Sequence, residues 1–177
     1  MANQRSQVVM GPDEVDEFLH QQRSATIATL GPTGRPHLVA MWYAVHEGAV
    51  WIETKAKSQK VVNLRRDSTM SFLVESGHTY DQLRGVSLEG RGEVVDDADV
   101  VWDVCVNVFE RYHAPYTEEV RPFVEVMAKN RVVVRLDVER TRSWDHRKLG
   151  LPAMELGGTT AEFLEVVAAG LSRAAAG

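Results

Sequence analysis

The feature that most constrains the fold of this 177-residue chain is a series of short strand patterns separated by turn sequences. The segments 24–30, 37–45 and 49–54 follow one another with only GPTGRP and HEG between them. Connections this short join neighbouring antiparallel strands, because a parallel crossover needs about a dozen residues or more. The sequence therefore predicts an antiparallel meander and excludes a Rossmann fold made of βαβ units.

Three more strand patterns follow, at 69–75, 85–95 and 131–144, with helical segments inserted between them. In the middle one, Gly90 and Gly92 indicate the bend or bulge that a barrel corner needs. Strands in hairpin order with inserted helices predict a mainly β chain of the α+β class, closed into a small antiparallel barrel.

Helical periodicity marks the remaining segments. A first helix is predicted from Asp13 to about Gln22, and Pro122 marks the start of regular helix in a later segment. Apolar residues at helical spacing predict another helix from Asp97 onward. Its inward residues are Val101, Val104, Val108 and Tyr112.

The chain is expected to divide at about residue 150. Residues 1–150 would form the cofactor-binding barrel domain. Residues 151–177 would form a C-terminal loop, a short amphipathic helix and a flexible, alanine-rich tail.

Charge and cysteine content narrow the function classes. The formal net charge is −5, whereas binders of nucleic acids or acidic membranes carry a broad basic surface, so neither partner is expected. The chain shows neither a membrane-spanning apolar run nor a secretory signal, so a cytoplasmic location is expected. The single cysteine, Cys105, is predicted to be an inert core thiol, and the histidines are isolated. No metal site is predicted.

A cluster of cations stands at the entry to one helix, in the stretch ETKAKSQKVVNLRRD at 53–67. Lys55, Lys57 and Lys60 surround Ser58, the natural cap, where a helix already carries partial positive charge. This arrangement opposes helix stability but suits an anion, because free N–H groups, a hydroxyl and ammonium groups converge there. A phosphate site and a solvated charged face are both consistent with the pattern.

Other polar and aromatic residues offer weaker candidates. Asp145 and His146 suggest an acid–base pair, although a polar loop explains the same dipeptide. Trp42 and Trp144 are candidates to flank a planar ligand, against the alternative of core or dimer packing. No nucleophile motif is present, so a bound cofactor that brings its own reactivity explains more than hydrolytic chemistry does.

The order of these elements resembles the pyridoxamine 5′-phosphate oxidase-like split β-barrel superfamily over roughly residues 15–144. The best motif is T-x-x-x-x-x-K-x-x-N-L-R-R-D, here Thr54, Lys60 and Asn63 with the string that ends at Asp67. Within the superfamily, the chain is most similar to the flavin/deazaflavin oxidoreductase B group, which uses the deazaflavin coenzyme F420. The resemblance implies a six-stranded antiparallel split β-barrel like that of FMN-binding proteins. It also implies a homodimer with cofactor sites along the subunit interface.

The resemblance further implies which residues bind the cofactor. The phosphate would lie near the helix entry, the ring along the second strand, and the loop 77–85 would approach from the partner subunit. The implied residues are Ala40, Met41, Trp42, Thr54, Lys55, Lys57, Ser58, Lys60, Asn63, His78, Tyr80 and Trp144.

The function implied is that of an F420-dependent oxidoreductase. It would transfer hydride between the cofactor and a small electron-poor organic substrate, such as an activated alkene, a quinone or a tetrapyrrole. No dedicated catalytic residue stands out, and solvent, Tyr80 or His78 would supply the proton.

Two alternatives stay open. One is an FMN-binding reductase or electron-transfer protein of the same fold, and the other is a non-catalytic protein that binds the cofactor or haem. The chain has Gln59 where the vitamin-B6 oxidases place an arginine, which weakens an FMN assignment. It also lacks their terminal Arg-x-His segment, which argues against vitamin-B6 oxidase activity.

Overall fold

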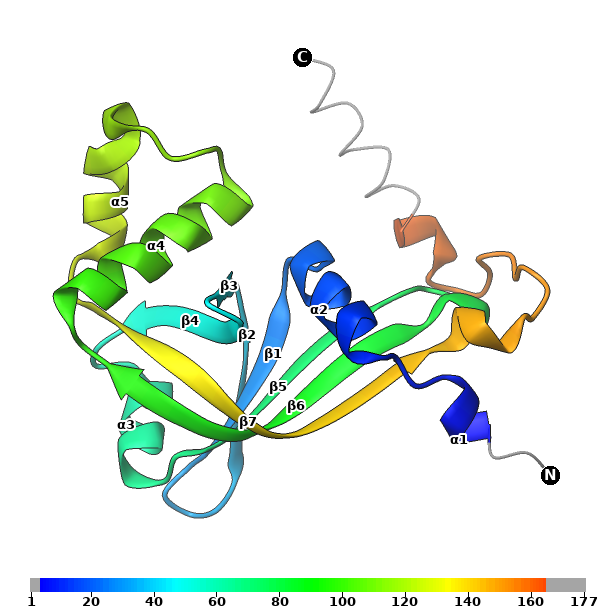
Figure 1. The fold of residues 1–177 in the computed structure, drawn as a ribbon. Coiled ribbons are helices and arrows are strands. Elements are labelled where there is room, and N and C mark those ends of the chain that lie inside the picture. The colour runs from blue at the N-terminus through cyan, green and yellow to red at the C-terminus, as the bar shows by residue number, and fades with distance from the viewer. Residues whose placement is uncertain (1–3, 165–177) are drawn as a thin grey trace.

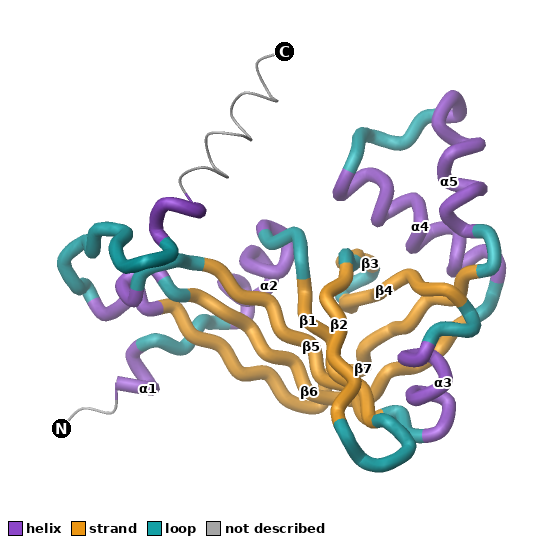
Figure 2. Tube along the Cα trace, turned by 180° about the vertical axis from the view of Figure 1, so that it is seen from behind, coloured by secondary structure: helices purple, strands orange, loops and turns teal. Residues whose placement is uncertain are grey.

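A computed structural model describes residues 4–164 of the chain as a strongly curled sheet with helices at its ends (Figures 1 and 2). The sheet has seven strands in the order β2-β1-β5-β6-β7-β4-β3, and each neighbouring pair is antiparallel. The predicted mainly β, antiparallel barrel is confirmed. The strands are β1 (Ala25–Leu30), β2 (Pro36–Met41), β3 (Ala44–His46), β4 (Ala49–Lys55), β5 (Thr69–Ser76), β6 (Arg84–Val95) and β7 (Arg131–Asp145).

The prediction of six strands was wrong by one, because the segment 37–45 is not a single strand. It breaks at Trp42 and Tyr43 into β2 and β3, which lie at the two opposite ends of the strand order. The main chain of Tyr43 leaves the ladder, and the Tyr112 hydroxyl satisfies it by accepting from its N–H and donating to its C=O, each at 3.1 Å. The chain therefore passes from one edge of the sheet to the other at this point.

The buried apolar side chains form two separate cores, and helices pack against both. Inside the curled sheet, Phe18, Ile27 and Phe72 belong to the first core. Between the outer face of β4 and the helix pair α4–α5, Trp51, Val104 and Val124 belong to the second. The helices are α1 (Gln4–Gln7), α2 (Pro12–Gln21), α3 (Gln59–Arg66), α4 (Ala98–Tyr112) and α5 (Arg121–Ala128), with 3-10 turns η1 (Tyr80–Gln82), η2 (Glu118–Val120) and η3 (His146–Leu149).

Local structure in β6, β7 and α3 can be compared with the sequence patterns. The predicted bulge is present as a register shift between Glu89 and Gly90 in the pairing of β6 with β7. Val138 lies beside this shift and beyond the stretch that pairs with β4, and it is 45 % exposed although it alternates with the buried Val134 and Leu136. Val62 is 52 % exposed, because the buried face of α3 carries Lys60 and Asn63 beside Val61 and Leu64.

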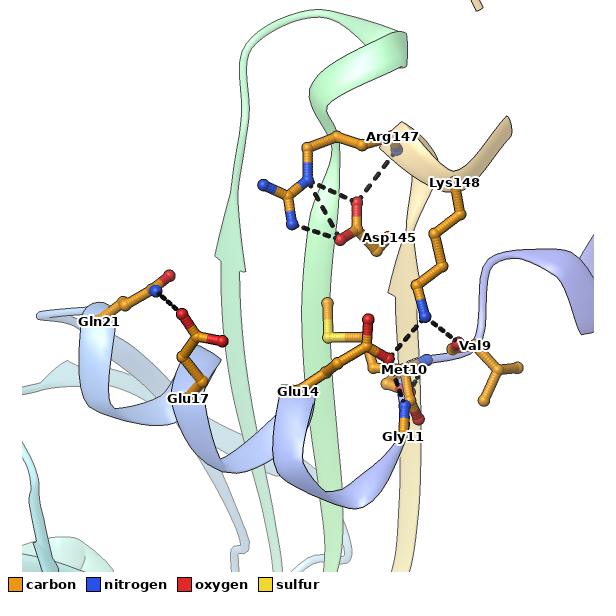
Figure 3. Close-up of polar contacts among 10 residues, drawn as sticks. Val9, Met10, Gly11, Glu14, Glu17, Gln21, Asp145, Arg147 and Lys148 are labelled. Carbon is orange, nitrogen blue, oxygen red and sulfur yellow. Dashed lines mark hydrogen bonds and ion pairs between the residues drawn. The ribbon is translucent and has the colours of Figure 1, made fainter. Parts of the chain in front are cut away.

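The segment before α2, residues 8–11, lies along the end of β7, and we call it the N-terminal strap. The Asp145 N–H donates to the Val8 carbonyl at 2.7 Å, and the Met10 N–H donates to Ser143 Oγ at 3.0 Å. Figure 3 shows that Lys148 reaches back to hold this strap from η3, donating to the Val9 carbonyl at 2.8 Å. The beginning of the chain and the end of its last strand therefore form one unit.

The C-terminal part is only partly described. Residues 151–157 have no regular secondary structure, and a helical turn begins at Ala161. The rest of the predicted helix and the alanine-rich tail, 165–177, lie outside the described residues. Within 4–164, no helix is both long enough and apolar enough to cross a membrane.

Candidate functional site

The entry of α3 holds a small network of buried polar side chains. Ser58 occupies the predicted cap position of α3 in extended conformation, but its side chain makes no capping hydrogen bond. The Lys60 ammonium donates to Thr54 Oγ1 at 3.0 Å, and the Thr54 hydroxyl donates to Ser58 Oγ at 3.2 Å. Both Lys60 and Thr54 are buried. An ammonium and two hydroxyls thus lie in a hydrogen-bonded row at the helix entry.

Among the described residues, no acid balances the charge of Lys60. No ion pair of Lys60 with a carboxylate is found in the part of the chain that the structure describes. Burial lowers the pKa of the Lys60 ammonium from its ordinary value, and the neighbouring Arg131 guanidinium lowers that pKa further. A bound oxyanion would oppose both effects, so the donor set suits a phosphate.

The predicted residues Lys55 and Lys57 are exposed beside this network, where they add positive charge without being held by it. Asn63 lies on the buried side of α3, and its Nδ2 donates to Thr29 Oγ1 at 3.0 Å. Its Oδ1 accepts from Gln59 Nε2 at 2.9 Å. Hydrogen-bonded side chains therefore join α3 to the end of β4 in one row and to β1 in a second row.

Thr29 was missed at the sequence level, although a pattern could have found it. It occupies an inward position of β1, two residues after the buried Ile27, where an apolar side chain is the usual choice. His37 lies directly opposite Thr29 on β2, and its buried Nδ1 has no partner among the described residues. A polar residue at an inward strand position indicates a site when a second element supplies its partner.

The three residues predicted to contact the cofactor ring, Ala40, Met41 and Trp42, lie at the end of the edge strand β2. Ala40 and Trp42 are exposed, whereas Met41 packs against the first core. Trp42 stacks on Tyr112 of α4 with ring centroids 4.4 Å apart and planes within 3°. Its side chain is 47 % exposed, so part of the indole is available to a planar ligand.

The remaining predicted residues gather at the other end of the sheet. Tyr80 and Trp144 line the same groove, together with His146, whereas His78 is exposed on the adjoining loop. The Trp144 indole lies against Gly85, its cross-strand neighbour. A Cβ at position 85 would come within 2.1 Å of the ring. Glycine at 85 is therefore what allows the indole to lie against the strand.

The suggested acid–base pair of Asp145 and His146 does not form. The Asp145 carboxylate accepts from the Arg147 guanidinium, with the shortest contact 2.5 Å (Figure 3). These hydrogen bonds hold the pKa of the Asp145 carboxyl below its usual range. His146 instead places its Nδ1 2.9 Å from the Tyr80 carbonyl. The two neighbours face different partners, as expected for adjacent residues.

Within this chain, the predicted site residues thus fall into three groups. The first surrounds the entry of α3, the second lies on the edge strand β2, and the third lines the groove at the far end of β7. The structure brings together the members of each group but does not join the groups.

Three comparisons with known proteins bear on this arrangement. The F420H(2)-dependent biliverdin reductase of Mycobacterium tuberculosis (strain CDC 1551 / Oshkosh) is 32% identical over 116 residues, which cover 64% of this chain and 81% of that protein. The crystal structure of the conserved hypothetical protein Rv2991 from Mycobacterium tuberculosis is 56% identical, with a TM-score of 0.87 over 90% of this chain and 99% of the other. A solved structure described as an F420 reductase is 22% identical and has a TM-score of 0.56 over 72% of this chain and 94% of the other. This last likeness shows the fold alone.

Family membership follows from a further match. Residues 12–145, from the start of α2 to the end of β7, match the pyridoxamine 5′-phosphate oxidase family. The match spans all seven strands and contains the α3 network, the β2 edge and the residues of β7 that line the groove. The chain belongs to the pyridoxamine 5′-phosphate oxidase family.

Proposed function

We propose that this protein is an F420-dependent oxidoreductase that transfers hydride between the deazaflavin and a small electron-poor organic substrate. The observation that carries the proposal is the buried Lys60 ammonium, which has the Thr54 hydroxyl as partner but no carboxylate among the described residues. The 32% sequence identity over 116 residues with an F420H(2)-dependent biliverdin reductase supports the choice of cofactor. The substrates considered are an activated alkene, a quinone or a tetrapyrrole.

The residues of the α3 entry would hold the cofactor phosphate. Lys60 and Ser58 would donate to its oxygens, while Thr54 fixes the position of both side chains. Lys55 and Lys57 would add charge from the exposed side, and Asn63 would keep α3 fastened to β1. The bound deazaflavin supplies a hydride at its ring carbon C5.

The β2 edge would position the ring. Trp42 is held by its stack on Tyr112, so it offers a rigid aromatic surface, and the main chain at Ala40 and Met41 lies next to it. The groove residues Tyr80 and Trp144, with His78 on the adjoining loop, would complete the site from a partner subunit. Such a homodimer would join the three groups of residues that one subunit keeps apart. A rigid, partly enclosed site orients the reactants and limits the access of water.

The proposal is tested by titrating the purified protein with F420 and, separately, with FMN. We expect F420 to bind at low micromolar concentration, and Lys60→Met to weaken its binding by about 1–3 kcal/mol, the cost of losing a charged hydrogen bond. Methionine keeps most of the buried stem, so circular dichroism should show an unchanged fold. Arg65→Met, at the exposed C-terminal end of the same helix, is the matched control and should leave the affinity unchanged.

Other outcomes would contradict the proposal. If the purified protein were yellow and bound FMN but not F420, the cofactor would be FMN. A Soret band from bound haem, without binding of F420, would favour the non-catalytic alternative. An equal loss of affinity in the Lys60 and Arg65 variants would remove Lys60 from the phosphate site.

A further inference from the structure

A groove of about 1230 Å³ runs along the end of β7 and the N-terminal strap. Its lining includes the arginines Arg5, Arg140 and Arg142, and none of the described residues that line it is an aspartate or a glutamate. The whole chain has a net charge of −5, so a groove lining without acidic residues differs from the acidic balance of the chain as a whole. The lining therefore carries an excess of cationic over acidic side chains, which favours anions.

The cations of the groove differ in how far they are neutralised. Arg142 forms an ion pair with Glu89 of β6, which lies outside the groove lining. Arg140 lies directly opposite Glu89 in the strand register, yet no ion pair of Arg140 is found within residues 4–164. Because Arg140, Arg142 and Trp144 alternate along β7, their side chains leave the strand on the same face. An uncompensated guanidinium therefore stands on the side of the strand that carries the indole.

The groove also has flat and apolar surfaces. The indole of Trp144 is fixed over Gly85, and the rings of Tyr80 and His146 lie 4.5 Å apart at the end of the groove. The N-terminal strap adds the exposed side chain of Val9 as an apolar surface, whereas the next residue, Met10, is buried in the first core. Lys148 keeps that surface in place through the Val9 carbonyl and through Glu14, whose carboxylate it meets at 2.6 Å (Figure 3).

We propose that this groove binds the organic substrate, and that the substrate is a planar conjugated molecule carrying a carboxylate or another anionic group. The guanidinium of Arg140 would pair with the anionic group, while Trp144 and Tyr80 would lie against the conjugated system. This inference rests on the proposed function, since it names the substrate class of the same reaction. Arg140 is a substrate-binding residue here, and it was not among the residues that the sequence singled out.

The test compares two probes that differ in a single group, 2-naphthoate and 2-naphthylmethanol, by calorimetric titration of the full-length protein. The wild type should bind the carboxylate about five- to tenfold more tightly than the alcohol, as expected for a partly exposed arginine–carboxylate pair. Arg140→Gln should remove that preference and leave the affinity for the alcohol unchanged. The control Arg35→Gln changes an exposed arginine of the β1–β2 turn that does not line the groove, and it should alter neither affinity.

Several results would overturn the inference. Equal affinities of the wild type for the two probes would show that the groove does not select anions. If the Arg35 and Arg140 variants lost the same affinity for naphthoate, the effect would come from the overall charge of the surface and not from the groove. If saturating F420 displaced the naphthoate, and Arg140→Gln weakened F420 to the same extent, the groove would hold the cofactor and not the substrate.

A second measurement separates this inference from the proposed function. With reduced F420 as donor, Arg140→Gln should raise KM for 1,2-naphthoquinone-4-sulfonate and leave KM for the neutral menadione unchanged. If the protein bound naphthoate as predicted but neither bound F420 nor reduced either quinone, the proposed function would fail while the anion-binding groove stood. Turnover of both quinones with equal effects of the substitution would support the function and reject the groove.

Discussion

Asp145 shows how one side chain holds the end of the last strand. Its buried carboxylate accepts from the Arg147 main-chain N–H at 3.0 Å and from the guanidinium of the same residue (Figure 3). The Asp145 N–H in turn donates to Val8, so the residue connects the strand, the 3-10 turn and the N-terminal strap. A carboxylate in this position stabilises the fold only while it is ionised.

The substitution Asp145→Asn should therefore reduce stability in a pH-dependent way. Because the pKa of the folded state lies below the ordinary value of 3.8, the stabilisation is complete above that value and is lost as the pH falls through the folded pKa. At pH 7 we expect a loss of about 1–2 kcal/mol in the free energy of unfolding, the value of charged hydrogen bonds. Urea denaturation of both proteins at pH 7 and at pH 3 measures it. A difference that stayed constant with pH would show that the carboxylate charge is not the cause.

Single residues also show where sequence patterns were sufficient. Cys105 was predicted to be an inert core thiol, and it is fully buried, with its pKa raised to about 12 by burial and by the neighbouring Glu53. No sequence pattern indicated that Glu53 would be buried. It lies buried on the outer face of β4, where it pairs with Arg131 at 3.3 Å and accepts from the thiol. The sequence places Glu53 in a basic run, but the pleat of the strand turns it away from that run.

At the scale of elements, the β3–β4 hairpin is the clearest case of local sequence specifying local structure. His46 pairs with Ala49, so the loop has only the two residues Glu47 and Gly48. Both have positive φ, 49° and 72°, as a type I′ turn requires. Glycine adopts this conformation without strain, whereas glutamate does so less readily than asparagine.

Replacing Glu47 should therefore change stability in a direction set by the new side chain. Glu47→Asn should raise the free energy of unfolding by about 0.5 kcal/mol, and Glu47→Val should lower it by about 1 kcal/mol, because a β-branched residue is strained at positive φ. Denaturant midpoints at an unchanged slope measure both effects. If the asparagine variant were no more stable than the valine variant, the turn would not have this conformation in solution.

Element prediction failed where one strand became two. The segment 37–45 is apolar or aromatic at every position after His37, so nothing local marks the break at Trp42 and Tyr43. The break depends on Tyr112, which is 69 residues away in the chain and supplies the hydrogen bonds that the ladder would otherwise provide. Such a partner is visible only in the folded molecule.

At the scale of the whole molecule, the edge strand β2 is unusual. It ends the strand order, and Leu38 on it is 65 % exposed, while Trp42 just beyond it is 47 % exposed. Exposed apolar side chains on a strand edge favour association with another chain. A second copy of this chain, as proposed for the complete site, would cover them and bring the groove of one subunit toward the α3 network of the other.

We therefore expect the wild type to be a dimer at micromolar concentration and Leu38→Arg to be a monomer, because the substitution would bury a charge at the interface. Light scattering coupled to size exclusion measures the mass, and F420 titration should show weaker binding for the monomer. Val126→Arg on α5, where the native side chain is 75 % exposed, is the control and should remain a dimer. A monomeric wild type that still bound F420 would contradict the shared site.

The sequence by itself determined that the sheet is antiparallel, and it also determined the bulge near Gly90, the helical segments and the cation cluster at the entry of α3. These depend on turn lengths, side-chain periodicity and residue type, which act between neighbours in the chain. Only the tertiary structure decided that Lys60 is buried against Thr54, that Tyr112 divides a strand, and that Arg140 and Trp144 share an acid-free groove with the N-terminal strap. Each of these depends on contacts between residues distant in sequence, and such contacts exist only once the sheet has curled.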